Sequence, residues 1–206
     1  MIDKNTEEYK FYIKDQEKDS ILEEQYINQG KQWSNKYCNF LTMNLLKNFD
    51  YSTKNILDVG CREFFTYDYF KSNFKNDIAG IDVCEKGLEY TNKYNKPAVY
   101  CDAHFMQEKF KPESFDLVMS FHAMEHFYDM KKCIENFYKT LAPGGYLYFA
   151  VPIPSVNEGR GHWQDIPSES FMINLCTNIG FKKVFSRDFP AGIFRDEREM
   201  VALFEK

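Results

Sequence analysis

Residues 55–60, Asn-Ile-Leu-Asp-Val-Gly, decide the fold class of this chain. A short apolar run ends in an acid, Asp58, which is followed after one residue by Gly60. This order is typical of a buried parallel strand that brings a carboxylate and a bare backbone turn to one end of a sheet. Open α/β sheets bind nucleotide-like ligands at such strand ends. Residues 61–64 then read Cys-Arg-Glu-Phe, where further glycines are expected.

The composition indicates one folded domain that is not built for nucleic acid. Of the 206 residues, 44% are hydrophobic and 17% aromatic, which suffices for a full core and excludes a disordered chain. The formal net charge is −5, and no long run of Lys and Arg occurs. Sequence-independent binding to nucleic-acid phosphates is therefore not expected as the main role.

The cysteines and the N-terminal sequence predict where in the cell the protein is located. The six cysteines are scattered without a close CxxC pair, which favours buried thiols in a reducing environment over a disulfide framework or a zinc site. The first residues lack the basic and apolar regions of a signal peptide, and no apolar stretch is long enough to span a bilayer. We expect a cytoplasmic protein without a membrane partner, either a monomer or a homodimer.

Strand and helix patterns alternate along most of the chain. The strand candidates are 54–59, 77–82, 97–101, 114–120, 144–151, 181–187 and 198–204. The helix candidates are 31–49, 63–74, 85–94, 129–141 and 168–179. This alternation predicts an α/β fold with a Rossmann-like, doubly wound, mostly parallel sheet. We expect residues 1–50 to form an N-terminal helical cap on a domain spanning 51–206, with a long functional loop at 152–167.

Acids and polar groups follow the predicted strands. Asp82 comes 24 positions after Asp58, a spacing that suits a carboxylate holding both hydroxyls of a ribose. Asp102 ends the next strand and could accept a hydrogen bond from an exocyclic amine. Residues 120–126, Ser-Phe-His-Ala-Met-Glu-His, form a polar turn after the fourth strand. Together these groups predict a ligand site at one edge of the sheet.

The order and spacing of these motifs resemble the class I S-adenosylmethionine-dependent methyltransferases, within them the small type-11-like group. The resemblance spans roughly residues 54–151. It implies a seven-stranded sheet whose last strand is antiparallel, with S-adenosylmethionine as cofactor. It also implies methyl transfer to an O or N nucleophile of a small molecule, with a sugar-linked glycan precursor or a phosphate-bearing acceptor suggested by analogy.

The matching motif positions imply a set of cofactor-binding residues along the strand ends. They are Asp58 and Gly60 at the methionine end, Asp82 at the ribose hydroxyls, Val83 at the adenine face, Asp102 and Ala103 at the adenine edge, and Ser120 and Phe121 beside the sulfonium.

The glycine loop departs from the family pattern Asp-x-Gly-x-Gly-x-Gly. Arg62 and Phe64 stand where the second and third glycines are usual, and glycine there permits positive φ and close backbone approach to a ligand. The change predicts a different loop path, a weakened cofactor site or a lost one. One hypothesis is a charge-assisted contact between Arg62 and the carboxylate of the cofactor. The alternative is that Arg62 points to solvent, as most arginines do.

Residues 122–126, His-Ala-Met-Glu-His, also match the H-x-x-E-H pattern of inverted zinc peptidases. In that pattern two histidines on one helix face bind zinc and the glutamate activates water. Here the segment follows a buried strand directly instead of lying inside a helix. We therefore predict that Glu125 and His126 cap or pack the following turn and that no residue binds a metal.

Three histidines are candidate general bases, because histidine titrates near neutral pH: His122, His126 and His162. His162 lies in the 152–167 loop, whose glycines and Trp163 suit a mobile lid with a stacking face. An ordinary surface or hydrogen-bonding role is the alternative. In the same loop, Arg160 could bind an anionic substrate, although a solvated arginine is the commoner case.

The N-terminal aromatic residues have two interpretations. Trp33 and Tyr37 belong to a stripe at helical spacing, which predicts core packing rather than a substrate box. The preceding segment carries Tyr9, Tyr12 and Tyr26 and could fold over the cofactor as a lid, while its high charge is equally compatible with partial disorder.

Other functions share some of these features. A nicotinamide-dependent oxidoreductase would also use the acid after the second strand, but the chain lacks G-x-G-x-x-G. A methyltransferase-fold protein without activity, serving as a binding partner or regulator, would explain the altered loop. A zinc hydrolase is the remaining alternative.

Overall fold

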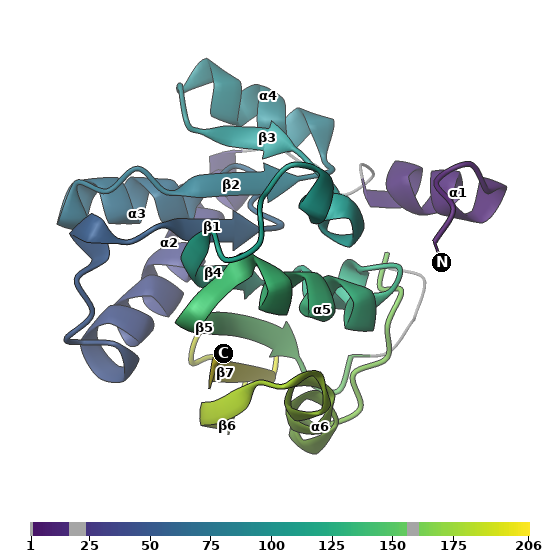
Figure 1. Cartoon of the computed structure of the whole chain (residues 1–206). Coiled ribbons are helices and arrows are strands. Elements are labelled where there is room, and N and C mark those ends of the chain that lie inside the picture. The colour runs from purple at the N-terminus through teal and green to yellow at the C-terminus, as the bar shows by residue number, and fades with distance from the viewer. Residues whose placement is uncertain (1, 17–23, 156–160) are drawn as a thin grey trace.

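The computed structural model describes residues 2–16, 24–155 and 161–206 (Figure 1). The helices are α1 (Glu7–Gln16), α2 (Glu24–Phe40), α3 (Phe65–Phe74), α4 (Glu85–Lys93), α5 (Met130–Thr140) and α6 (Glu169–Ile179). Short turns of π- or 3₁₀-helix are η1 (Leu41–Leu45), η2 (Tyr51–Thr53), η3 (Ala103–Glu108) and η4 (Met124–His126). The strands are β1 (Ile56–Val59), β2 (Ala79–Asp82), β3 (Ala98–Tyr100), β4 (Phe115–Phe121), β5 (Leu141–Pro152), β6 (Lys182–Phe189) and β7 (Glu199–Glu205).

The strands form one seven-stranded sheet in the order β3-β2-β1-β4-β5-β7-β6. Neighbours from β3 to β5 pair in parallel, and β7 runs antiparallel to both β5 and β6. The strand order reverses between β1 and β4, which opens a crevice beyond their carboxyl ends. The predicted Rossmann-like fold with an antiparallel last strand is confirmed.

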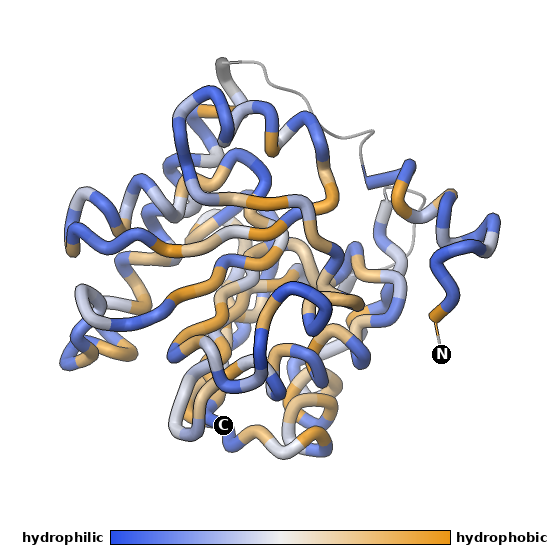
Figure 2. The backbone as a smooth tube through the Cα atoms, turned by 45° about the horizontal axis from the view of Figure 1, so that its top comes forward, coloured by the Kyte–Doolittle hydropathy of each residue, from blue (hydrophilic) through white to orange (hydrophobic). Residues whose placement is uncertain are grey.

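The two faces of the sheet carry separate cores, since successive side chains of a strand point to opposite faces. Leu57 and Val59 of β1 pack in the cluster that holds α5 and α6, while Ile56 packs in the cluster that holds α2 and α3. The strands therefore read as continuous apolar runs, as the sequence predicted for a sheet covered on both sides. In Figure 2 the strands are mostly orange, with blue segments around them.

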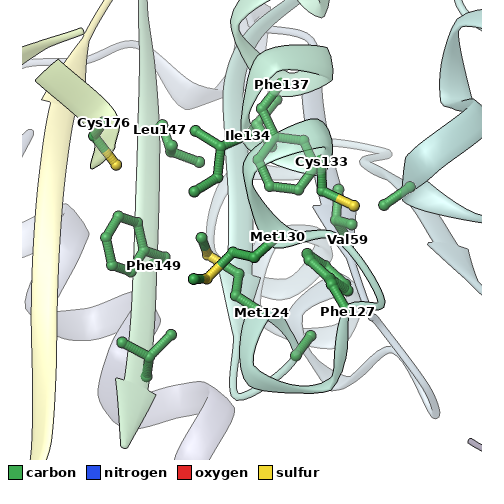
Figure 3. Close-up of a cluster of buried hydrophobic side chains, with 14 of the residues drawn as sticks. Val59, Met124, Phe127, Met130, Cys133, Ile134, Phe137, Leu147, Phe149 and Cys176 are labelled. Atoms are coloured by element: carbon green, nitrogen blue, oxygen red, sulfur yellow. The ribbon is translucent and has the colours of Figure 1, made fainter. Parts of the chain in front are cut away.

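Helix α5 shows how the sequence sets a helix and its buried face. The Asp129 side chain accepts a hydrogen bond from the Lys132 backbone N–H at 2.9 Å and caps the N-terminus. Buried side chains then recur at helical spacing, and Figure 3 shows those of α5 against β5. The ones labelled there are Met130, Cys133, Ile134 and Phe137 on α5, and Leu147 and Phe149 on β5.

The N-terminal helices differ in their limits from the predicted helix at 31–49. Helix α2 begins at Glu24 and ends at Phe40, and a π-turn follows in which the Leu46 N–H donates to the Leu41 carbonyl at 2.8 Å. The apolar spacing continued past 40, so periodicity alone did not reveal the change of helix type. Figure 1 shows α1 beyond the carboxyl ends of β2 and β3.

Two further expectations concern the whole described chain. All six cysteines are buried free thiols, as predicted. Within the described ranges, no helix combines the length and the apolar character needed to cross a bilayer.

The loop between β1 and α3 is fixed by one aromatic ring. Phe64 is fully buried, and its ring lies against Gly80 of β2. A Cβ at Gly80 would come within 2.9 Å of that ring and 2.8 Å of the Cys61 sulfur. Because Gly80 has no side chain, the space beside it is free for the ring of Phe64.

We expect Gly80→Ala to destabilise the protein by about 1–3 kcal/mol, because the added methyl group overpacks this contact. Phe64→Leu in the same chain should restore part of the loss. Urea denaturation of the two single variants and the double variant forms the cycle, with an expected coupling of at least about 0.5 kcal/mol. Additive effects of the two changes would contradict the packing argument.

Candidate functional site

Two adjoining cavities open at the carboxyl ends of β1, β2 and β4. The first, of about 210 Å³, has α2 as one wall, and we call it the α2-side cavity. The second, of about 90 Å³, is lined in part by Tyr12 and Gln16 of α1, and we call it the α1-side cavity. Gly60, Arg62 and His122 line both. A single elongated ligand could therefore extend from one cavity into the other.

The loop at residues 60–64 has the left-handed backbone conformation that glycines would adopt, although only one of its residues is glycine. Gly60 has φ +76°, and a Cβ there would lie 2.3 Å from the Ala123 methyl group. Arg62 and Phe64 also have positive φ, of 45° and 57°. Such left-handed conformations cost about 1–3 kcal/mol each in a non-glycine residue. The substitutions that the sequence flagged thus leave the left-handed turn in place.

Lys96 supports the strained turn from the other side. Its ammonium group is buried and donates to the backbone carbonyls of Glu63 and Phe64 at 3.0 and 3.2 Å. It also pairs with the Asp68 carboxylate at 2.8 Å. Burial lowers the pKa of Lys96, and the hydrogen bond to Asp68 opposes that shift. These contacts give the carbonyl groups of the turn a buried cationic donor.

Asp82 connects the loop to the end of β2. Its two carboxylate oxygens accept backbone N–H groups of Arg62 at 2.8 Å and Cys84 at 2.7 Å. Burial raises the pKa of Asp82, while these hydrogen bonds oppose the shift. Asp82 and Val83 line the α1-side cavity, on the side where the resemblance placed a ribose and an adenine.

Asp102 fastens α1 to the end of β3. Its carboxylate accepts hydrogen bonds from the Tyr9 hydroxyl and from the backbone N–H of His104, at 2.8 Å for the latter. Burial would raise the pKa of Asp102, but the hydrogen bonds and charge of His104 hold it below its usual value. Asp102 and Ala103 line the α1-side cavity. Tyr9 therefore ties α1 to Asp102, and Tyr12 of the same helix lines the cavity.

Asp58 lies in the wall of the α2-side cavity as a buried carboxyl group. Its hydrogen-bond partner is the Thr66 hydroxyl of α3. Burial raises the pKa of Asp58 to about 7, with a smaller contribution from the charge of Asp82. A cation in this cavity would favour the ionised form of Asp58.

Phe121 and Ser120 at the end of β4 have different surroundings. Phe121 lines the α2-side cavity and stacks on Tyr37 of α2, with ring centroids 4.9 Å apart. Ser120 is fully buried and lines neither cavity; among the described residues its hydroxyl has no hydrogen-bond partner. Tyr37 is both a core residue and a cavity wall, so the sequence-based choice between core packing and a binding box was too narrow.

His122 lines both cavities and is held there by groups that sequence reasoning missed. Its Nε2 lies 2.7 Å from the Glu199 carboxylate and 2.9 Å from the Tyr37 hydroxyl. Burial would lower the pKa of His122, but hydrogen bonds to Glu125 and Glu199 raise it. Glu199 could have been predicted to have a buried partner, because it is an acid at the start of the apolar strand 199–205. An acid at such a position is seldom buried unless it is paired.

The other two candidate bases approach each other. His126 lines the α1-side cavity, and His162 lines neither cavity, but their ring centroids are 4.7 Å apart. Burial lowers the pKa of His162. Glu125 is buried beside them. Arg160, the candidate for an anionic substrate, lies outside the described residues.

Trp33 and Arg195 line the α2-side cavity. The Arg195 guanidinium lies 4.1 Å from the centre of a Trp33 ring. Arg195 could not be predicted from the sequence, because the loop between β6 and β7 carries no motif. A cation and an aromatic face from distant segments thus meet at the cavity.

Comparison with known proteins identifies the domain. The family model described as a methyltransferase domain matches residues 57–149. This segment belongs to the type-11 methyltransferase-domain family. The match covers β1 to β5, and so the strand ends that carry the cavities. It supports S-adenosylmethionine as the cofactor. No curated protein matches the chain in sequence.

Solved structures of methyltransferases share the fold at low sequence identity. An S-adenosylmethionine-dependent methyltransferase from Mesorhizobium loti is 15% identical, with a TM-score of 0.62 over 74% of this chain and 91% of that one. One from Archaeoglobus fulgidus is 14% identical, with a TM-score of 0.64 over 89% and 100%. Phosphoethanolamine N-methyltransferase 2 from Haemonchus contortus, in complex with S-adenosyl-L-methionine, is 17% identical, with a TM-score of 0.62 over 84% and 52%.

The pKa of Asp58 predicts a pH dependence of stability. Between about pH 4 and pH 7 the folded protein holds a proton on Asp58 that the unfolded chain has released, so the free energy of unfolding falls as pH rises through this window. Asp58→Asn removes that dependence. The stability of this variant relative to the wild type should rise by up to about 1.4 kcal/mol per pH unit until about pH 7 and then level off.

Urea denaturation at pH 5, 6, 7 and 8 measures the effect. The control is Asp77→Asn, an exposed carboxylate whose pKa is held below its usual value by hydrogen bonds from Lys71 and Tyr67. It should leave the slope between pH 5 and 8 unchanged. Parallel curves for Asp58→Asn and the wild type would contradict a proton on Asp58.

Proposed function

We propose that this protein transfers a methyl group from S-adenosylmethionine to an O or N nucleophile of a small molecule. The observation that carries the proposal is the pair of adjoining cavities with Asp58 in one wall and Asp82 in the other. Two buried acids in separate cavities suit a ligand that has a cationic amino-acid end, near Asp58, and a ribose, near Asp82. When bound, the cofactor supplies a reactive methyl group on a positively charged sulfur.

The chain's own residues would hold the two ends of the cofactor. Asp82 lies where it can accept from ribose hydroxyls, and its backbone hydrogen bonds already fix its carboxylate. Val83, Asp102 and Ala103 would surround the adenine in the α1-side cavity. Asp58 would face the ammonium group of the cofactor. Its raised pKa reflects the cost of ionising a buried carboxyl group, and a bound cation would offset that cost.

The N-terminal segment would act as a cap over this site. Residues 1–50 supply α1 and α2, and each helix contributes a wall to one cavity. Excluding water and aligning the two reactants would provide most of the rate increase, since methyl transfer is an in-line displacement. The six buried free thiols are consistent with a reducing, cytoplasmic location.

The acceptor would enter the α2-side cavity. Arg195 and Trp33 offer a cation and an aromatic face there, which suits a sugar-linked or phosphate-bearing acceptor. Of the candidate bases, His122 is the one that lines both cavities, so it is placed to receive a proton from the acceptor.

Calorimetric titration with S-adenosylhomocysteine, NAD(H) and zinc tests this function. We expect S-adenosylhomocysteine to bind and NAD(H) not to bind. Asp82→Asn should weaken S-adenosylhomocysteine roughly 10- to 100-fold, the worth of hydrogen bonds to a charged group. Asp188→Asn on β6, paired with Arg198 away from the cavities, is the matched control and should bind as the wild type does.

Each alternative outcome has a meaning. Binding of NAD(H) in place of S-adenosylhomocysteine would favour the oxidoreductase. Binding of neither ligand to a folded protein would favour the inactive relative that serves as a partner or regulator.

Arg62 gives a separate prediction. Arg62 lines both cavities, so its guanidinium is a candidate contact for the carboxylate of the cofactor. Arg62→Gly keeps the backbone conformation at φ 45° and removes the charge, so S-adenosylhomocysteine should bind roughly tenfold more weakly. Lys86→Gln, at an exposed position of α4, controls for net charge. If Arg62→Gly binds as tightly as the wild type, the contact does not exist.

A further inference from the structure

Three potential metal ligands meet where the β4 turn touches the loop after β5. They are Glu125, His126 and His162, and one ligand atom from each lies within 4.8 Å of the others. Glu125 is buried, and the two histidines are half-buried. A carboxylate with two imidazoles is a ligand set that proteins use for zinc and related divalent ions.

Hydrogen bonds already orient both histidines. The Nδ1 of His126 lies 3.1 Å from the Gly161 carbonyl, which can only accept, so Nδ1 is the donor and the lone pair of the neutral imidazole lies on Nε2. The Nδ1 of His162 is 3.0 Å from the Ser155 hydroxyl. Metal-binding histidines are held in this way, with one nitrogen fixed by an oxygen and the other turned to the ion.

The burial of Glu125 supports a cation site independently of the distances within the cluster. Its side chain is 1% exposed, and its Oε2 has no hydrogen-bond partner among the described residues. A buried carboxylate oxygen without a partner is costly, and a cation would remove that cost.

The backbone builds the cluster. The N–H groups of Trp163 and Gln164 donate to the Glu125 carbonyl at 2.9 and 3.1 Å. These bonds place the segment next to His162 directly on the β4 turn. The three ligands are therefore brought together by backbone contacts and do not rely on the chance approach of long side chains.

We propose that Glu125, His126 and His162 bind one divalent transition-metal ion of the zinc class. Three protein ligands leave at least one coordination position open, as in catalytic rather than structural sites. The site borders the α1-side cavity through His126.

The ligand set differs from the one that the sequence motif suggested. In the H-x-x-E-H pattern His122 would bind the metal, but its Nε2 is engaged by Glu199 and Tyr37. His162, from the loop after β5, takes that place. The proposal thus departs from the sequence-based expectation that no residue binds a metal.

The test uses the full chain after dialysis against a chelator. ZnCl₂ is titrated by calorimetry, and CoCl₂ by visible absorption, which reports coordination number. We expect one ion per chain and a thermal midpoint that rises with ZnCl₂. His162→Ala, on the half-buried loop, should weaken binding by at least about 100-fold, and Ser155→Ala by about tenfold.

Asp77→Asn is the control, because it changes an exposed carboxylate that pairs with Lys71 away from the cluster, and it should retain the ion. His122→Gln tests the ligand set of the sequence motif, in which His122 binds in place of His162. Thermal melts of each variant check folding, and Ser155→Ala keeps the test open if His162→Ala does not fold. No ion bound to the folded wild type, or binding that His162→Ala leaves unchanged, would overturn the site. Loss in His122→Gln with retention in His162→Ala would also overturn it.

Titration of the same protein with S-adenosylhomocysteine separates this proposal from the methyltransferase function. Metal binding without S-adenosylhomocysteine binding would support the metal site and contradict the proposed function. S-adenosylhomocysteine binding without metal binding would overturn the metal site and leave the proposed function standing.

Discussion

The packing of the Phe64 ring against Gly80 is the contact on which the rest of the site depends. The ring belongs to the core between the sheet and the α2–α3 layer, so the backbone that carries it must turn sharply after β1. That turn places Arg62 with a left-handed backbone and directs its N–H to Asp82. Lys96 then satisfies the carbonyls that the turn exposes to the interior. A loop that usually relies on glycine for its shape here relies on core packing and one buried cation.

The acids along the strand ends are set to different states by their surroundings. Asp58 is buried with one hydroxyl partner, and its pKa rises to about 7. Asp102 is also buried, but His104 and Tyr9 supply hydrogen bonds and charge that keep its pKa low. The difference follows from the number of donors aimed at each carboxylate. The site therefore offers an ionised acceptor at one end and, before ligand binds, a carboxyl group with a pKa of about 7 at the other.

The turn after β4 divides its polar residues between two neighbouring clusters. His122 turns toward Glu199 of β7, on the side of the α2 helix, and joins the wall of both cavities. Glu125 and His126 turn toward His162 in the loop after β5. The two clusters touch, since the His122 Nδ1 lies 3.6 Å from a carboxylate oxygen of Glu125.

The sequence by itself determined the fold class, because apolar strands, helix periodicity and acids at strand ends are local signals. Asp58 and Asp82, for example, each follow directly on the apolar residues of their own strand. It did not reveal that Phe64 would preserve a left-handed turn, since the compensating gap at Gly80 lies on another strand. Nor did it reveal Glu199 beside His122, which only the antiparallel return of β7 brings close. Contacts between segments far apart in the chain are set by topology and packing, and only the tertiary structure decided them.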